Sequence, residues 1–233
     1  MTRIDGSRAL VIGATGVLGT LIAERLSEGG ASLALSGRDA ARLDERAGQG
    51  AAIAVDLTDE TAPETIVGRA TEALGGLDVI VLAAGVVGFD SVAETAEQDL
   101  ETLFTVNALA PMRIVSAALP ALRESAEAGR EPVVLALTGI VAELPTAGLG
   151  SYSASKAALA AYLTAAGREL RRSGIRLLDA RPGHTETGLA GRPLFGTAPK
   201  FPAGHDPAAV ADRLVRAIAE GETALPPGAF TGT

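Results

Sequence analysis

The sequence predicts a doubly wound α/β fold, in which one open, parallel β-sheet carries helices on both of its faces. The first observation is that short apolar runs, typical of buried strands, alternate along the chain with longer segments of helical periodicity. The second is a glycine-rich turn at 13–19, which joins the first apolar run to a helical pattern. The third is that no linker, repeat or low-complexity block interrupts this alternation. We therefore expect the 233 residues to form a single three-layer domain.

The strands and helices are placed by apolar runs and by the turn residues between them. The strands are expected at 9–12, 32–36, 51–55, 77–84, 132–138 and 175–180, with a short edge strand within 223–230. The helices are expected at 18–26, from 40 onward, and at 60–74, 98–127, 151–172 and 207–220.

Capping signals set the ends of several helices. Asp39 is expected to cap the helix that begins at Ala40. The pair Gly75-Gly76 is expected to end the helix at 60–74. Thr95 and Gln98 have the spacing of a capping box for the helix that follows them.

The helix at 98–127 contains a proline within its pattern. Leu100, Leu103 and Phe104 are expected to face the core. Pro111 lacks a backbone donor and clashes one turn back, so a kink is expected near Asn107. An Asn beside loosened carbonyls can hold a water, but a surface position for Asn107 fits the local pattern equally well.

Composition limits the kind of protein. Hydrophobic residues form 47% of the chain, which allows a large core, and the net charge of −8 disfavours a nucleic-acid or anionic-membrane partner. The sequence has no Cys and only two His, so we expect neither a thiol nucleophile nor a metal site. The first residues lack the apolar core of a signal peptide, and the longest apolar run, 79–89, is shorter than the roughly 20 residues of a membrane helix. A soluble, cytoplasmic protein is expected.

Tyr152 and Lys156 form the pair most suggestive of chemistry. In a helix, their spacing places the two side chains on one face, one turn apart. A Tyr with a pKa of about 10 is a poor acid or base at neutral pH, but a neighbouring cation favours the phenolate and lowers that pKa. Tyr152 could then exchange protons with a substrate. The pair alone does not distinguish this role from an ordinary surface helix that carries an aromatic residue and a charge.

The turn at 13–19 is the second candidate site. Its glycines permit a tight turn and let backbone N–H groups approach a pyrophosphate, while the N-terminus of the following helix favours negative charge. A strand before the turn and a helix after it are the context that a dinucleotide site needs. A plain strand-to-helix connection is the alternative.

The residues after the second strand bear on which dinucleotide binds. A site that prefers NAD usually has a carboxylate there, which binds the ribose diol. Ser36, Gly37 and Arg38 occupy this position, and an Arg with a hydroxyl suits the 2′-phosphate of NADP. Since Asp39 is expected to cap the next helix, NADP is favoured over NAD.

Taken in order, these motifs resemble the short-chain dehydrogenase/reductase family, in its compact single-domain branch, over about residues 8–190. The matching positions are the cofactor turn 13–19, the adenine-binding acid Asp56, the segment 83–85, the tetrad residue Asn107, the YxxxK pair Tyr152 and Lys156, and the nicotinamide segment with Pro182, Gly183 and Thr187. A chance occurrence of all of them in this order is improbable.

Three positions depart from the family pattern. Val17 stands where compact members usually have the middle glycine, and the resulting spacing is more typical of the branch with epimerases and dehydratases. Leu82 replaces an Asn behind the cofactor. The catalytic Ser usually lies thirteen residues before the Tyr, which is Gly139 here, so the neighbouring hydroxyl of Thr138 is expected to hold the substrate oxygen instead.

The resemblance implies a Rossmann-type domain with a cofactor half at about 1–130 and a catalytic and substrate half at about 131–233. The segment at about 188–206, which lacks periodicity, is expected to be a flexible loop over the site. The residues expected to bind the cofactor are Gly13, Thr15, Gly16, Val17, Leu18, Gly19, Ser36, Arg38, Asp56, Leu57, Ala84, Gly85, Asn107, Tyr152, Lys156, Pro182, Gly183, Thr185 and Thr187. The expected substrate walls are Val86, Val87, Leu144, Leu149, His184, Leu189 and Phe195, which suit a mostly apolar substrate, although a structural role is favoured for His184.

The implied activity is an NADP(H)-dependent oxidoreductase that interconverts a small carbonyl compound and its alcohol. The implied catalytic residues are Asn107, Thr138, Tyr152 and Lys156. Tyr152 would act as general acid/base, Lys156 would lower its pKa and bind the nicotinamide ribose, and Asn107 would seat a water that links Lys156 to solvent.

Two other functions stay open. The departures at Gly139 and Leu82 would suit an NADP-binding sensor or scaffold with weak or lost catalysis. The glycine spacing would suit an epimerase or dehydratase, although the short segment after Thr187 disfavours it. The helices at 98–127 and 151–172 imply a homodimer or homotetramer.

Overall fold

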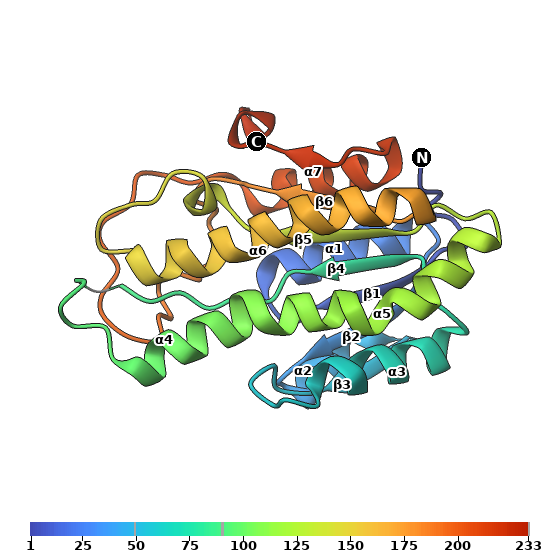
Figure 1. The fold of residues 1–233 in the computed structure, drawn as a ribbon, viewed down its shortest axis with the longest axis horizontal. Coiled ribbons are helices and arrows are strands. Elements are labelled where there is room, and N and C mark those ends of the chain that lie inside the picture. Colours follow the sequence, from blue (N-terminus) through green and yellow to red (C-terminus); the bar gives the residue numbers. More distant parts are fainter. Residues whose placement is uncertain (49, 90, 233) are drawn as a thin grey trace.

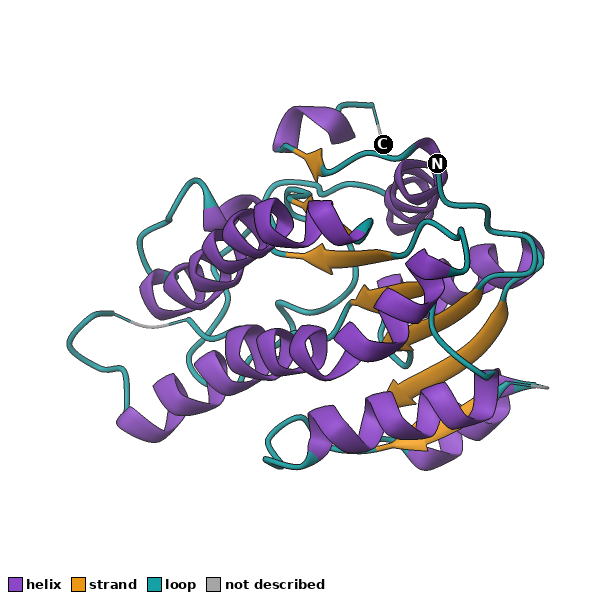
Figure 2. Cartoon of the chain, turned by 45° about the vertical axis from the view of Figure 1, so that its right-hand side comes forward, coloured by secondary structure: helices purple, strands orange, loops and turns teal. Residues whose placement is uncertain are grey.

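The computed structural model describes residues 1–48, 50–89 and 91–232, and in them one parallel sheet carries helices on both faces, as predicted (Figures 1 and 2). The strands are β1 (Arg8–Ile12), β2 (Ser32–Gly37), β3 (Ala51–Ala54), β4 (Val79–Leu82), β5 (Val133–Leu137), β6 (Arg176–Ala180) and β7 (Ala224–Leu225). The helices are α1 (Val17–Glu28), α2 (Ala40–Ala47), α3 (Ala62–Leu74), α4 (Glu97–Phe104), α5 (Ala110–Glu127), α6 (Gly150–Leu170) and α7 (Pro207–Glu220).

The strand order in the described part of the chain is β3-β2-β1-β4-β5-β6-β7. The winding therefore reverses between β1 and β4, and the carboxyl ends of these strands form the crevice in which doubly wound proteins bind ligands. The predicted edge strand within 223–230 is confirmed as β7, which pairs in parallel with β6.

Strand β1 shows why helices cover both faces. Leu10 and Ile12 pack in a cluster with α3, α5 and α6, whereas Ala9 and Val11 pack in a second cluster with α1 and α7. Because successive side chains of a strand point to opposite faces, a continuous apolar strand must be covered twice. Figure 1 shows α3, α5 and α6 together in front of the sheet.

Two of the three capping predictions are confirmed. The Asp39 carboxylate accepts a hydrogen bond from the Arg42 N–H at 3.1 Å, and Gly75 ends α3 with a left-handed φ of +70°. The capping box at Thr95 and Gln98 is wrong, because Ala96 occupies the N-cap of α4. Thr95 therefore lies outside the helix end that it was expected to cap.

The distortion predicted near Asn107 is present as a π-helical turn, Thr105–Leu109, between α4 and α5. Pro111 cannot donate to the carbonyl one turn before it, and a π-turn is a common response to such a break. Asn107 becomes fully buried. Leu103 faces the core as expected, but Leu100 does not, since it is 39% exposed.

The continuous helical run Glu97–Glu127 is also long and apolar enough, by length and composition alone, to cross a membrane. Half of its most apolar window is buried inside the protein. One such helix is weak evidence for a membrane span.

Asp78 is a buried carboxylate at the start of β4. It accepts hydrogen bonds from the Arg8 guanidinium at 2.7 Å and from the Ser125 hydroxyl at 2.6 Å. Burial acts to raise the pKa of Asp78, but the bonds from Arg8 and Ser125 outweigh it and lower this pKa to about 2. The three side chains of Arg8, Asp78 and Ser125 thus join β1, β4 and α5 at the amino edge of the sheet.

Asp78→Asn is expected to lower the free energy of unfolding at pH 7 by about 3 kcal/mol, because it leaves a partly buried Arg8 without its counter-charge. Since the folded pKa is depressed, the stability from ionised Asp78 is present above pH 4 and is lost as the pH falls towards 2. Urea denaturation at several pH values should therefore show the parent and the variant converging below pH 4. Asp212→Asn removes an exposed carboxylate that pairs with Arg25 at 2.7 Å and is the matched control, because solvent screens this pair and its loss should leave the urea midpoint nearly unchanged.

Candidate functional site

The glycine turn lies at the carboxyl ends of β1 and β4. Gly13 has a φ of +83°, and a Cβ there would come within 2.5 Å of the Ala84 backbone nitrogen. A Cβ on Gly19 would lie 2.1 Å from the Gly13 carbonyl oxygen. Both glycines are therefore required by close backbone packing. The turn leads into α1, whose first-turn N–H groups have no acceptor within the helix and favour an anion.

Arg38 lies beside this turn, just after β2. Its side chain is 73% exposed, and its Nη1 is 3.9 Å from Asp56 Oδ2. The other carboxylate oxygen, Asp56 Oδ1, accepts from the Thr58 N–H at 2.9 Å, which fixes the acid. A Cβ on Gly37 would lie 3.1 Å from Thr15 Oγ1, so the turn and the end of β2 are in contact. A cation and an acid thus border the turn together.

Two residues expected beside Arg38 face elsewhere. The Ser36 hydroxyl is buried and has no hydrogen-bond partner among the residues that the structure describes. The side chain of Leu57 packs in the main core with Ile53. The expectation that the Ser36 hydroxyl accompanies Arg38 is therefore wrong, since strand alternation turns that side chain inward, and Leu57 offers a ligand only its backbone.

Asn107 joins the loop after β4 to α6. Its amide accepts from the Val86 N–H at 3.0 Å and donates to the Val86 carbonyl at 2.9 Å. It also donates to the Ser155 hydroxyl at 3.0 Å, which itself donates to the Tyr152 carbonyl at 2.8 Å. Asn107 thus fixes the helical turn that carries Tyr152.

Lys156 reaches from α6 to the ends of β4 and β5. Its Nζ donates to the Leu137 carbonyl at 2.8 Å. A Cβ on Gly85 would lie 3.3 Å from this Nζ and 3.4 Å from Asn107 Oδ1, so only a glycine leaves both groups undisturbed. Lys156, Asn107 and Gly85 therefore meet at one point next to the glycine turn.

Burial is the main influence on the pKa values of Tyr152 and Lys156. It raises the pKa of Tyr152 to about 12 and lowers the pKa of Lys156 to about 8. The expectation that Lys156 lowers the Tyr152 pKa is wrong for the protein alone, because the ammonium is bonded to the Leu137 carbonyl and desolvation opposes the phenolate. At neutral pH, Tyr152 is a protonated phenol.

Thr138 does not face the site. It is fully buried, and its hydroxyl donates a short hydrogen bond to the Asp179 carboxylate on β6. The expectation that this hydroxyl holds a substrate oxygen is therefore wrong. Gly139, at the position of the missing Ser, has a φ of +78°, and a Cβ there would have only contacts of 3.8 Å or longer. Space for a side chain is present, but the backbone favours glycine.

The segment after β6 turns back on itself. The Thr185 hydroxyl donates to the Gly183 carbonyl at 3.0 Å, and the Thr187 N–H donates to the Thr185 carbonyl at 2.7 Å. Pro182 accepts at its carbonyl from the Ile140 N–H at 2.9 Å, which joins this segment to the loop after β5. These residues border the same strand edge as Lys156.

The loop at 188–206 packs against the segment that follows β4. The Leu194 N–H donates to the Val87 carbonyl at 2.8 Å, and the Phe89 N–H donates to the Phe195 carbonyl at 3.1 Å. The Phe195 ring lies so close to Gly88 that a Cβ there would approach it to 2.1 Å. These contacts fasten the loop to the segment that follows β4.

An apolar cluster surrounds Tyr152 beneath this loop. Its members are Val87, Phe89 and Leu149, with Val141, Tyr152, Leu189, Ala190, Ala198 and Phe201 packed against them. Two of the expected substrate walls are not members of this cluster: Leu144 is 59% exposed, and Val86 packs against the main core. The cluster leaves the side chain of Tyr152 partly buried.

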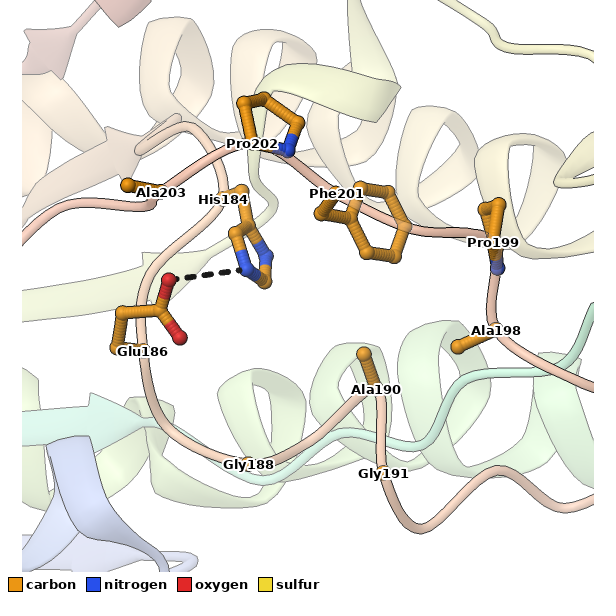
Figure 3. Close-up of a pocket in the computed structure, with 10 residues that line it drawn as sticks. All are labelled: His184, Glu186, Gly188, Ala190, Gly191, Ala198, Pro199, Phe201, Pro202 and Ala203. Carbon is orange, nitrogen blue, oxygen red and sulfur yellow. Dashed lines mark ion pairs between the residues drawn. The ribbon is translucent and has the colours of Figure 1, made fainter.

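A pocket of about 320 Å³ opens within the loop (Figure 3). Its walls include Ala190, Ala198 and Phe201, which also belong to the cluster around Tyr152. Figure 3 shows His184 and Glu186 paired on one side of the pocket, with 3.5 Å between Nε2 and Oε1, and the His184 ring stacks on Phe201 at 4.8 Å. His184 is thus largely held by its own loop.

Three residues that were not expected at the site lie beside the predicted ones. Ser155 holds Asn107, while Asp179 and Arg181 occupy the end of β6 beside Thr138. Asp179 is only 6% exposed. A carboxylate within an apolar strand, directly before the Pro182-Gly183 turn, was the signal in the sequence that could have identified it.

Comparison with known proteins agrees with this geometry. The sequence matches the short chain dehydrogenase family over residues 7–193. An uncharacterized oxidoreductase of Staphylococcus epidermidis is 26% identical over 224 residues, which cover 94% of each chain.

Solved structures share the fold at lower identity. A 3-ketoacyl-(acyl-carrier-protein) reductase from Brucella melitensis, complexed with NADH, has a TM-score of 0.84 at 23% identity, covering 96% of this chain and 97% of that chain. A short chain dehydrogenase from Burkholderia cenocepacia, in complex with NADP, has a TM-score of 0.82 at 22% identity, covering 97% of this chain and 90% of that chain.

Proposed function

Since the chain belongs to the short-chain dehydrogenase/reductase family of oxidoreductases, we propose that it transfers a hydride between NADP(H) and the carbon of a small carbonyl compound or alcohol. The observation that best supports this activity is the position of Lys156. Its Nζ is bonded to the Leu137 carbonyl and lies against Gly85, next to the glycine turn that packs on Ala84. The helix face with Tyr152 and Lys156 therefore borders the dinucleotide crevice.

The residues at the crevice fit a dinucleotide. Gly13 and Gly19 leave no room for a Cβ, so the turn keeps the backbone close to the strand ends and presents the first-turn N–H groups of α1 to a pyrophosphate. Asp56 would hold the adenosine end, and the segment from Pro182 to Thr187 would hold the nicotinamide end. When bound, NADP(H) supplies or accepts the hydride.

Tyr152 is the proposed proton donor in the direction of reduction. The phenol carries its proton at neutral pH, and the apolar cluster packs around its ring. Lys156 would restore the proton and bind the ribose, while Asn107 holds the helical turn in place. Because Thr138 is bonded to Asp179, the substrate oxygen is held chiefly by Tyr152.

Arg38 is the proposed determinant of NADP over NAD. Arg38→Gln is expected to weaken NADPH binding by about 10- to 100-fold, because a charge-assisted contact contributes roughly 1.5–3 kcal/mol, and to change NADH binding by less than about threefold. Titration of the nicotinamide fluorescence measures both. The control is Arg42→Gln, since Arg42 pairs with Asp39 on the outside of α2. An equal loss for both dinucleotides would assign Arg38 a structural role.

A second function, NADP binding with weak or lost catalysis, is favoured by one observation. Gly139 has no hydroxyl, and the neighbouring hydroxyl of Thr138 is buried on Asp179. Stoichiometric NADPH binding without oxidation in the presence of a broad panel of ketones and aldehydes would support this function. Oxidation of NADPH with any of these carbonyl compounds would exclude it.

We further propose a cytoplasmic homodimer or homotetramer that acts on a mostly apolar carbonyl compound. The helices α4, α5 and α6 lie together on one side of the molecule (Figure 2), and Leu100 and Leu109 are exposed there by 39% and 42%. Exposed apolar side chains on long helices suit a self-interface. Sedimentation at micromolar concentration tests this, and a monomer would contradict it.

A further inference from the structure

Asp179 is a buried carboxylate with both oxygens bonded. One oxygen accepts from the Thr138 hydroxyl, and the other accepts from Arg181 Nε at 2.8 Å and from Nη2 at 2.7 Å. Arg181 also donates to Glu143 Oε2 at 3.0 Å. Buried carboxylates persist only where such partners hold them. The family's proton-transfer residues do not require this acid, so its place in the fold needs another reason.

The carboxylate lies next to the acceptor of the catalytic ammonium. Lys156 donates to the Leu137 carbonyl, and Leu137 directly precedes Thr138, whose hydroxyl holds Asp179. Strands β5 and β6 are paired here, with Leu137 opposite Ala180. The two buried charged side chains, Lys156 and Asp179, are thus bonded to consecutive residues at the end of β5, Leu137 and Thr138.

Lys156 needs such a counter-charge. It is 5% exposed, and its Nζ bonds to a neutral carbonyl, so burial favours loss of its proton. The Asp179 carboxylate acts in the opposite direction and raises the pKa of Lys156. The groups around it are the Leu137 carbonyl from β5, Gly85 after β4, the Asn107 amide, and Asp179 with Arg181 from the end of β6. On α6 itself, Tyr152 stands one turn before Lys156.

We propose that Asp179 is a positioning residue that keeps Lys156 in its ammonium form at neutral pH, with Thr138 and Arg181 fixing the two carboxylate oxygens. In this proposal Thr138 orients the Asp179 carboxylate and does not contact the substrate. The role of Asp179 in catalysis rests on the proposed function. The effect of Asp179 on the protonation of Lys156 does not. The experiment therefore has one arm without catalysis and one arm with it.

The first arm measures Lys156 directly. The chain contains only two lysines, Lys156 and Lys200, so lysine labelled with ¹³C at Cε gives two resonances, which Lys200→Arg assigns. Asp179→Asn is expected to lower the proton affinity of Lys156 by about tenfold. Arg181→Gln is expected to raise it, because it removes the cation that competes for Asp179. Unchanged titration in both variants would overturn the proposal.

Glu143→Gln is the matched control. It removes a carboxylate from the same network, but Glu143 is half exposed and reaches Asp179 only through Arg181. The proton affinity of Lys156 should change by less than about threefold. A change equal to that of Asp179→Asn would show a diffuse effect of net charge and would overturn the proposal. Should Asp179→Asn fail to fold, Arg181→Gln tests the proposal alone: a raised proton affinity of Lys156 supports it, and an unchanged one overturns it.

The second arm is the dependence of kcat/KM for NADPH oxidation on pH. Asp179→Asn should keep most of its activity near pH 6 and lose it at a lower pH than the parent, with the alkaline limb moved by about one pH unit. An equal loss at every pH would indicate a purely structural role and contradict the assignment. If the parent itself shows no turnover, the proposed function fails, and the titration of Lys156 still decides the coupling.

Discussion

Tyr152→Phe is expected to lower kcat by about a thousandfold, with little change in NADPH binding. A positioned general acid contributes about 10²- to 10⁴-fold to such reactions, and Thr138 does not share the task here, since its hydroxyl is bonded to Asp179. Phe keeps the packing of the aromatic ring in the apolar cluster around position 152. Steady-state NADPH oxidation with the best carbonyl substrate measures the loss, and dinucleotide titration measures binding.

The chain offers a matched control for this substitution. Tyr162 is the other tyrosine, it lies on the same helix α6, and its hydroxyl makes one long contact of 3.4 Å with the Met112 carbonyl. Tyr162→Phe should change kcat by less than about twofold, as expected for a position away from the reacting atoms. Similar losses in the two variants would mean that the phenol of Tyr152 has no special part in proton transfer.

Lys156→Met is expected to lower kcat by at least about a hundredfold and to change how stability depends on pH. Burial depresses the pKa of Lys156 from 10.5 to about 8, so the unfolded chain binds the proton more tightly than the folded one. Stability is therefore reduced below pH 8 and recovers as the pH rises from 8 to 10.5, by about 3 kcal/mol.

Urea denaturation of the parent and Lys156→Met between pH 7 and 10.5 isolates this effect. Tyr152 contributes in the other direction only above pH 10, where its unfolded phenol ionises, and it is common to both proteins. Met matches the length of Lys but leaves the Leu137 carbonyl without its donor, which costs roughly 1–3 kcal/mol at every pH. The rise between pH 8 and 10.5 should be absent in the variant. An equal rise in both proteins would mean that Lys156 is not desolvated.

The sheet and its helices could be predicted because their signals are local. The run at 9–12 is apolar throughout, and both of its faces are covered. The Asp39 carboxylate caps α2 by accepting from the N–H of Arg42, three residues later in the chain. Pro111 distorts the helical turn that precedes it, at Thr105–Leu109. Each of these depends on residues close together in the sequence.

The errors at the site arise from contacts between distant residues. Thr138 is turned from the substrate by a carboxylate on another strand, 41 residues away in the chain. Ser36 faces inward because of the strand register, which a one-residue shift would reverse. The pKa of Tyr152 depends on burial by the loop at 188–206, whose position no periodicity reveals. Spacing in the sequence selected the candidate residues but not which of their atoms face the crevice.

Transfer of deuterium tests the central claim most directly. NADPH deuterated at either face of C4 is incubated with the protein and a panel of ketones and aldehydes, and the products are analysed by mass spectrometry. One deuterium per NADP formed should appear on the former carbonyl carbon of an alcohol, from one face only. Stoichiometric binding of NADPH with no deuterated alcohol from any carbonyl compound would contradict the proposal that this protein carries out hydride transfer.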